Sequence, residues 1–168
     1  MNLSTELQLE TKDADFLTKY GFVSHVMAQC RNYRLFQILC QKIWIEPPIL
    51  LRQAAFFINQ QGTPAGYVTW AYLTPEVEAR LLGDPQFALH LSEWQEGENV
   101  WIMDLAAPHG QARPMLRQLA RDIFPHTPRL HYIRRSSDGR IRKRISLKNP
   151  YHAAAPAHAR EGKIVAAR

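Results

Sequence analysis

Residues 100–110 read Val-Trp-Ile-Met-Asp-Leu-Ala-Ala-Pro-His-Gly, and this stretch decides the fold around it. An apolar run closed by a proline and a glycine is typical of a buried strand that ends in a turn. Asp104 stands in the middle of that run. A buried carboxylate is costly unless it is paired or hydrogen-bonded. Asp104 is therefore either an anchor for the turn or part of a functional site.

The sequence after this strand predicts a helix and then a hairpin. Residues 112–124 place apolar side chains at helical spacing on one face. The other face repeats an arginine at every fourth position, at Arg113, Arg117 and Arg121. Residues 129–147 form two strand-like runs about Ser136-Ser137-Asp138-Gly139, and Asp-Gly between such runs is a strong hairpin signal.

The sequence before the strand predicts a hairpin and a capped helix. The apolar runs 49–58 and 64–72 flank Asn59-Gln60-Gln61-Gly62, a pattern typical of two antiparallel strands. Thr74, followed by a proline, has the features of a helix N-cap. Residues 86–99 predict a short helix and a loop.

The N-terminal part has a helical pattern over residues 14–45. We expect Gly21 to divide this segment into two helices and Pro47-Pro48 to end it. The element order helix, strand, strand, helix, strand, helix, strand, strand predicts an α+β fold, a mostly antiparallel sheet flanked by helices.

The chain has 168 residues, of which 46% are hydrophobic and 21% charged, which predicts one domain with a hydrophobic core. We expect a flexible arm over residues 1–13, a single domain over 14–150 and a disordered basic tail over 151–168. No run approaches the roughly 20 apolar residues needed to span a bilayer. The polar, acidic start lacks the features of a signal peptide, so the expected compartment is the cytoplasm.

Metal and disulfide chemistry find little support in the sequence. Cys30 and Cys40 have no CxxC or Cys/His zinc spacing, and we interpret Cys30 as a small core residue. Seven histidines are scattered along the chain. Of these, His25 beside the apolar helix face and His109 after the Asp104 strand are candidates to pair with Asp104.

Positive charge gathers in one region of a chain whose net charge is +6. The predicted C-terminal hairpin is rich in arginine and lysine, including Arg134, Arg135 and Arg142. Such a patch suits an acidic protein, an anionic membrane surface or nucleic acid. A solvated hairpin face is the plain alternative.

Three blocks of sequence carry a family resemblance. They are residues 21–28 (Gly-Phe-Val-Ser-His-Val-Met-Ala), 64–71 (Pro-Ala-Gly-Tyr-Val-Thr-Trp-Ala) and 101–108 (Trp-Ile-Met-Asp-Leu-Ala-Ala-Pro). In this order and spacing the chain resembles the RTX toxin-activating lysine acyltransferases, the family that activates haemolysins and adenylate cyclase toxins. The resemblance extends over about residues 16–145.

The resemblance implies a GNAT-like fold and a transfer of fatty acyl groups to internal lysines of a protoxin. It implies acyl carrier protein as the donor, with no permanently bound cofactor or metal, and a cytoplasmic, dimeric protein. The family's essential pair is an aspartate, which corresponds to Asp104, and a histidine, whose place Tyr33 takes here. Arg34 follows as in the family pattern, and the pattern's serine is Cys30.

Three interpretations of Tyr33 at the histidine position stay open. His25 or His109 restores the pair with Asp104, although His25 reaches it only if its helix is shifted or broken. Alternatively, Asp104 and Tyr33 support slower or different acyl chemistry, with Tyr33 as a hydrogen-bond donor. In the third interpretation the protein is a pseudoenzyme that binds a carrier without turnover.

A rival of another class is a non-catalytic binding module that uses the basic hairpin, for example for nucleic acid. We consider nucleic acid the weaker partner because Tyr132 is the one stacking aromatic near the hairpin. An acidic acyl carrier protein suits the same charge.

Overall fold

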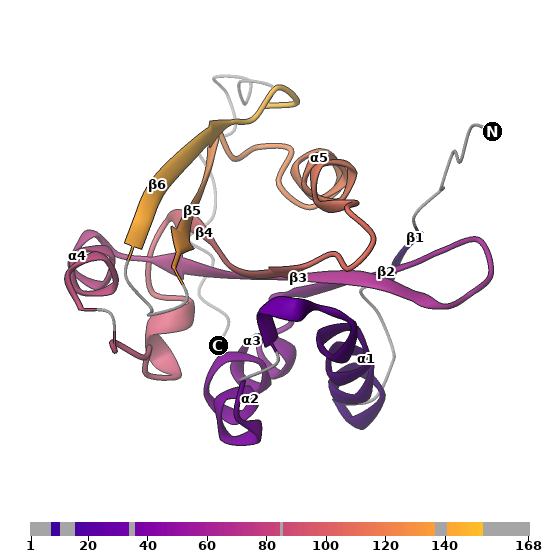
Figure 1. Ribbon diagram of the computed structural model, residues 1–168. Helices are drawn as coiled ribbons and strands as arrows, with labels where there is room; N and C mark the ends of the chain where they lie inside the picture. Colours follow the sequence, from indigo (N-terminus) through magenta and orange to yellow (C-terminus); the bar gives the residue numbers. More distant parts are fainter. Residues whose placement is uncertain (1–7, 11–15, 34–35, 85, 137–140, 153–168) are drawn as a thin grey trace, which may run out of the picture.

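The computed structural model describes residues 8–10, 16–33, 36–84, 86–136 and 141–152. The fold is α+β: helices cover both faces of one mixed, mostly antiparallel sheet whose strands lie in chain order (Figure 1). The elements are β1 (Gln8–Glu10), α1 (Phe16–Gln29), the 3-10 turn η1 (Arg31–Tyr33), α2 (Ile38–Trp44), α3 (Glu46–Leu50), β2 (Ala54–Ile58), β3 (Pro64–Leu73), α4 (Pro75–Gly83), the 3-10 turn η2 (Ser92–Trp94), β4 (Asn99–Ala106), α5 (Ala112–Asp122), β5 (Arg129–Arg135) and β6 (Ile141–Lys148).

Three apolar clusters hold these layers together. The first lies between the sheet and α5, and includes Trp70, Ile102 and Met115. The second lies on the opposite face under α1 and α3, and the third joins the ends of β3 and β4 to α4 and η2. Strand β3 is buried along nearly its whole length because helices cover both of its faces, which explains its almost continuous apolar sequence.

The turn and cap signals are confirmed. Asn59 ends β2, and its Oδ1 accepts hydrogen bonds from the backbone N–H groups of Gln61 and Thr63, both at 3.0 Å. Thr74 caps α4 by accepting from the N–H of Val77 at 3.3 Å. The predicted strands at β2–β3 and β5–β6 and the helix α5 are present.

The N-terminal helical segment differs from the prediction. Helix α1 runs unbroken through Gly21, so the predicted division there is wrong, and the chain instead leaves the helix after Gln29. Pro47 and Pro48 do not end a helix but lie in the first turn of α3, where a missing N–H costs no hydrogen bond. Strand β2 accordingly begins at Ala54, later than predicted.

The chain ends also differ in part from expectation. Within the segment expected to be a flexible arm, Gln8–Glu10 form β1 and pair with β2. The expected tail lies outside the described residues beyond position 152. In the described ranges no helix combines the length and apolar character that a membrane crossing requires.

Strand β4 contains a bulge that sets the direction of Asp104. Thr69 of β3 pairs with Asp104, whereas the next residue of β3, Trp70, pairs with Ile102, so Met103 is the extra residue of β4. Ile102 and Leu105 consequently contact the same cluster under α5, although their spacing would put them on opposite faces of a regular strand. The bulge thereby turns Asp104 to the face covered by α1 and η1.

Strands β4 and β5 are parallel neighbours joined by α5, and they separate after a short contact. Their register contains two pairs, Trp101 with His131 and Ile102 with Tyr132. Beyond these, β4 continues against β3 while β5 continues against β6. The β5–β6 hairpin turns out of the plane of β2 and β3 toward the side that carries α5 (Figure 1). The sheet is therefore open between β4 and β5.

The close approach of β3 to β4 and α5 predicts the effect of a single methyl group. A Cβ at Gly66 would lie 2.5 Å from the carbonyl oxygen of Ala106 and 2.9 Å from Sδ of Met115. We expect Gly66→Ala to destabilise the protein by about 1–3 kcal/mol, measured by chemical denaturation. The matched control is Gly21→Ala, where a Cβ meets nothing within 4 Å. That variant should be about 0.5–1 kcal/mol more stable, and equal effects of the two changes would contradict the packing described.

Candidate functional site

Asp104 is held by two tyrosines from different parts of the chain. Its Oδ1 accepts hydrogen bonds from the hydroxyl of Tyr33 and, at 2.9 Å, from the N–H of Leu105. Its Oδ2 accepts from the hydroxyl of Tyr67 at 2.7 Å. An ionised carboxylate has about four acceptor positions. These three bonds thus leave Oδ2 able to accept one more.

The local structure of η1 brings Tyr33 to this carboxylate. After α1 the chain tightens into turns in which the N–H of Cys30 donates to Met27 O and that of Tyr33 donates to Cys30 O. The ring of Tyr33 then packs edge-on against Phe36, with centroids 5.5 Å apart. A continued α-helix would have carried Tyr33 away from the sheet, so the break after Gln29 is what places it.

Tyr67 reaches Asp104 from the neighbouring strand. Its side chain is fully buried on β3, on the face under α1 and α3. Thr69, two residues along β3, faces the same side and pairs in register with Asp104. Thr69 is also fully buried, and its hydroxyl has no hydrogen-bond partner within the described ranges. Thr69 lines neither cavity of the described structure, so its hydroxyl is a buried polar group beside the site.

Burial dominates the electrostatics of this cluster. It raises the pKa of the Asp104 carboxyl above its ordinary value of 3.8, while the bonds from Tyr33, Tyr67 and Leu105 N–H act in the opposite direction. Burial, followed by the charge of Asp104, raises the pKa of both tyrosine hydroxyls far above 10.0. Both tyrosines therefore stay protonated at neutral pH and donate to a carboxylate that accepts a proton more readily than an exposed aspartate.

The Cys30 thiol lies close enough to feel the same charge. Burial, and after it Asp104, raises the pKa of this thiol above its ordinary value of 9.0. Such a thiol stays protonated at neutral pH and is a weak nucleophile. Both Cys30 and Cys40 are free thiols, and Cys30 is a partly buried residue that packs against the cluster under α1, at the edge of the core in which it was predicted.

A groove of about 1150 Å³ runs from Asp104 through the opening between β4 and β5. Tyr33, Asp104 and Met103 line it on one face of the sheet, whereas Leu116 and Tyr132 line it on the α5 face. We call this cavity the β4–β5 groove. Beyond β6, buried Asn149 ties the two walls together, because its side-chain amide donates to the carbonyl oxygens of Ala120, Phe124 and Thr127 at 2.7–3.2 Å.

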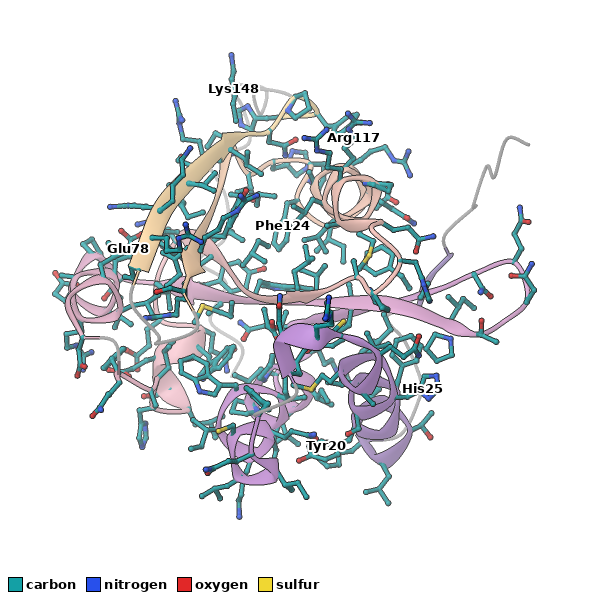
Figure 2. The ribbon with its side chains drawn as sticks, in the orientation of Figure 1. Tyr20, His25, Glu78, Arg117, Phe124 and Lys148 are labelled. Atoms are coloured by element: carbon teal, nitrogen blue, oxygen red, sulfur yellow. The ribbon has the colours of Figure 1, made fainter. Side chains whose placement is uncertain are left out.

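Cations surround the outer end of the groove. Arg117 on α5 and Lys148 on β6 lie on the same side of the molecule, at the rim formed by these two elements (Figure 2). Asp104 is the acidic residue among the lining residues that the structure describes. The lining cations are Arg113, Arg117, Arg134, Arg135, Arg142, Lys143 and Lys148.

The predicted partner-binding residues fall partly within this set. Arg134 and Arg142 are exposed on β5 and β6 and line the groove. Arg135 is half-buried, and its Nη2 donates to the carbonyl oxygen of Leu81 at 3.4 Å. Arg34 lies outside the described residues.

Neither candidate histidine contacts Asp104 in the described structure. His25 is exposed and points outward from α1 (Figure 2). Because α1 is continuous through His25, the shift or break that would bring it to Asp104 does not occur. His109 is exposed in the turn after β4. Of the catalytic candidates, the structure therefore brings together Tyr33 and Asp104.

The sequence interpretation did not identify Tyr67, Arg113 and Arg117 as site residues. The arginine repeat on α5 was visible, but a polar helix face normally faces solvent, and nothing local showed that a second basic wall stands opposite. Tyr67 belongs to the second of the three blocks that carry the resemblance, yet its bond to Asp104 depends on the β3–β4 register. That register includes the bulge at Met103.

Comparisons with known proteins identify the family of this chain. Residues 12–148 match the model of the HlyC, or RTX toxin acyltransferase, family. Over 107 residues, 63% of this chain and 72% of the relative, the chain is 25% identical to an uncharacterized protein of Synechocystis sp.. It is 25% identical to the lysine-acyltransferase RtxC of Vibrio cholerae, over 48% of this chain and 54% of the relative.

A further relative is the RTX-II toxin-activating lysine-acyltransferase ApxIIC of Actinobacillus pleuropneumoniae. It is 32% identical over 79 residues, which are 47% of this chain and 48% of the relative. The chain thus spans about half the length of the named lysine-acyltransferases that it matches. The family match itself covers most of the chain, and we conclude that the protein belongs to the RTX toxin acyltransferase family.

Proposed function

We propose that the protein moves a fatty acyl group from the thioester of acyl carrier protein to an internal lysine of a protein of the RTX protoxin type. The observation that carries this proposal is the position of Asp104, at the end of a groove that crosses the sheet and opens among cations. Two relatives bear names that state lysine acyl transfer, and one of these names adds toxin activation.

The shape and charge of the groove suit a thioester on a carrier. The prosthetic arm of an acyl carrier protein is long, thin and carries a phosphate, and the carrier itself is acidic. The opening between β4 and β5 admits a thin arm, and Arg134, Arg142 and Arg117 surround its entrance. Positive potential at the entrance speeds the encounter with an acidic partner.

The chemistry needs a group that takes a proton from the attacking lysine. A free lysine has a pKa of about 10.4, so its ammonium first releases one proton to water, because the neutral amine is the form that attacks a carbonyl carbon. As that nitrogen bonds to the thioester carbon, the Asp104 carboxylate accepts a second proton from it on the open Oδ2 position. The carbon–sulfur bond then breaks, and Asp104 passes this proton to the sulfur of the carrier. Its raised pKa makes Asp104 a better acceptor than an exposed aspartate.

Tyr33 and Tyr67 are positioning residues in this scheme. Their hydroxyls fix both oxygens of Asp104 and stay protonated, so neither competes with Asp104 for the proton of the lysine. In this mechanism the tyrosine at the family's histidine position keeps the aspartate oriented, and the aspartate acts as the base. We propose a cytoplasmic reaction with no resident cofactor. The homodimer that the resemblance implied stays a prediction.

A second candidate function is a carrier-binding protein without turnover. The presence of Tyr33 in place of a histidine favours it. Donor binding without acylation of any lysine would support this candidate against the enzyme. The test uses purified protein, acyl carrier protein loaded with palmitoyl or myristoyl chains, and an RTX protoxin acceptor domain, with intact-mass detection of acyl-lysine. Absence of acylation with every donor would overturn the enzyme proposal.

Removal of the Asp104 charge separates catalysis from folding. Asp104→Asn keeps the size of the side chain and an oxygen for one tyrosine hydroxyl, but it cannot accept the proton. We expect acyl transfer to fall by about 10²–10⁴-fold in a variant whose thermal unfolding remains cooperative. Asp122→Asn, at the exposed end of α5, is the matched control and should keep wild-type activity. A fully active Asp104→Asn protein would reduce Asp104 to a turn anchor.

The pH dependence follows from the raised pKa of Asp104. Transfer should decline on the acid side as the carboxylate becomes protonated, with a midpoint above 3.8. Tyr33→Phe removes a hydrogen bond that lowers this pKa, so the acid limb should move to higher pH. Tyr72→Phe, on the other face of β3, should leave the limb in place. If the acid limb of the pH profile stays fixed or moves to lower pH in Tyr33→Phe, Asp104 is not the group that accepts the proton.

Protein stability offers an independent check of the same pKa. A carboxyl whose pKa is raised on folding contributes most stability at low pH, and this contribution is lost as pH rises through the folded-state pKa. The free energy of unfolding of wild type relative to Asp104→Asn should therefore decrease as pH rises from the ordinary value of 3.8.

Charge reversal at the groove entrance tests carrier recognition. The double variant Arg134→Glu, Arg142→Glu should raise KM for the acyl carrier protein by about tenfold or more, with a small change in kcat, and weaken its salt dependence. Lys42→Glu, exposed on α2, is the control and should behave as wild type. An unchanged KM in the double variant would rule out this face as the carrier site.

A further inference from the structure

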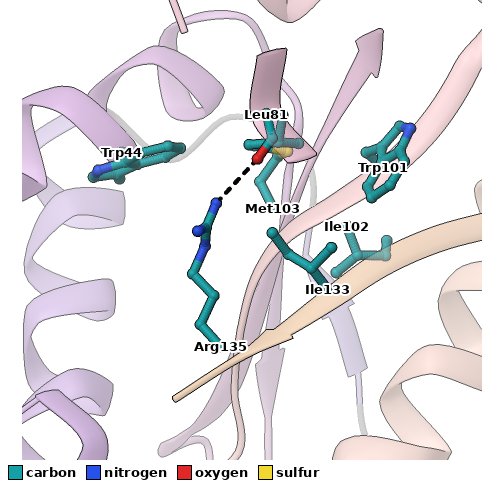
Figure 3. Close-up of a pocket in the computed structure, with 7 residues that line it drawn as sticks. All are labelled: Trp44, Leu81, Trp101, Ile102, Met103, Ile133 and Arg135. Atoms are coloured by element: carbon teal, nitrogen blue, oxygen red, sulfur yellow. Dashed lines mark hydrogen bonds between the residues drawn. The ribbon is translucent and has the colours of Figure 1, made fainter. Parts of the chain in front are cut away.

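A second cavity adjoins the β4–β5 groove beside Asp104. It has a volume of about 220 Å³ and is lined by Trp44, Leu81, Trp101 and Met103, together with Ile133 and Arg135 (Figure 3). Ile102, Met103, Ile133 and Arg135 line both cavities, so the two spaces meet where β4 and β5 separate. We call the smaller one the tryptophan pocket.

We propose that the tryptophan pocket holds the hydrocarbon chain of the acyl donor. This inference rests on the proposed function, since it assumes a thioester at Asp104. Met103, the bulge residue, precedes Asp104 directly and lines both cavities. A chain attached to a carbonyl at Asp104 therefore enters the pocket across Met103 without a further bend of the protein.

The chemistry of the lining selects an alkyl chain over the acceptor lysine. Apart from Arg135, the lining side chains are apolar or aromatic. A lysine ammonium in the pocket would leave water and lie close to the guanidinium of Arg135, and both effects are unfavourable. Arg135 is held in the lining by its hydrogen bond to the Leu81 carbonyl oxygen at 3.4 Å (Figure 3).

The pocket is preformed because contacts with neighbouring side chains hold its two tryptophans in place. The indole N–H of Trp101 donates to Glu78 at 2.6 Å, and Arg144 lies over the Trp101 ring at 5.2 Å. His131 stacks on the same ring with centroids 5.3 Å apart. Trp44 packs edge-on against Trp94. A rigid apolar site loses little free energy to ordering when a ligand enters.

The volume sets an expected chain-length limit. A water molecule takes about 30 Å³ of liquid volume and a methylene group is of similar size, so 220 Å³ accommodates about seven methylenes. Each buried methylene should tighten binding by about fourfold. The affinity for the donor should consequently rise along a chain series and flatten once the pocket is full.

The test measures binding and transfer with acyl carrier protein that bears acetyl, butanoyl, hexanoyl, octanoyl, decanoyl or dodecanoyl chains. Tryptophan fluorescence gives Kd, and intact-mass detection of acyl-lysine gives kcat/KM. In the wild type we expect Kd to fall by about fourfold per methylene up to octanoyl and then to level off. Ile133→Trp takes up part of the pocket, so its series should level off at a shorter chain than octanoyl.

Two further variants make the result specific. Ile145→Trp, on β6 and outside the lining of either cavity, is the matched control and should keep the wild-type series. Trp44→Ala enlarges the pocket and should extend the rise toward dodecanoyl. This opposite shift keeps the test decisive if Ile133→Trp does not fold.

The outcomes separate this inference from the proposed function. A chain-length series that Ile133→Trp and Trp44→Ala leave unchanged overturns the pocket assignment, even if lysine acylation occurs. Chain-dependent binding that shifts in these variants, with no acylation of any lysine, supports the pocket while it overturns the enzyme proposal.

Discussion

The site depends on one half-buried carboxylate and the two tyrosine hydroxyls that hold it. Hydrogen bonds from Tyr33, Tyr67 and the N–H of Leu105 offset the cost of removing the Asp104 carboxylate from water. Each partner comes from a different element: η1, β3 and β4. The carboxylate consequently links the first helical segment to the middle of the sheet. Removal of either tyrosine hydroxyl would weaken this link and would leave the Asp104 side chain less firmly oriented.

Two departures from regular strand geometry turn this link into an accessible site. The bulge at Met103 rotates Asp104 toward η1, and the separation of β4 from β5 opens a passage to it from the α5 face. Without the bulge, the carboxylate would point into the apolar cluster around Met115 and Leu119. Without the separation, a continuous sheet would seal it from the basic rim.

Local sequence signals predicted much of this fold. Asn59, Thr74 and the arginine-bearing helix α5 act through contacts within a few residues, so their patterns are readable from the sequence. The apolar run around Asp104 likewise indicated a buried strand with a carboxylate in need of partners. The break of the first helix after Gln29 was not predicted, because the apolar spacing continues past it and the 3-10 turn depends on the tie between Tyr33 and β4.

The partners of Asp104 could not be read from the chain for the same reason. The bond from Tyr67 requires the β3–β4 register, and the opening between β4 and β5 follows from where their pairing stops, both of which are long-range properties. A crystal structure with a non-hydrolysable thioether analogue of acyl-phosphopantetheine tests the role of Asp104 most directly. We expect its carbonyl-equivalent carbon beside Oδ2 of Asp104, with the phosphate among Arg117, Arg134 and Arg142. A ligand bound elsewhere, with Asp104 untouched, would contradict the account.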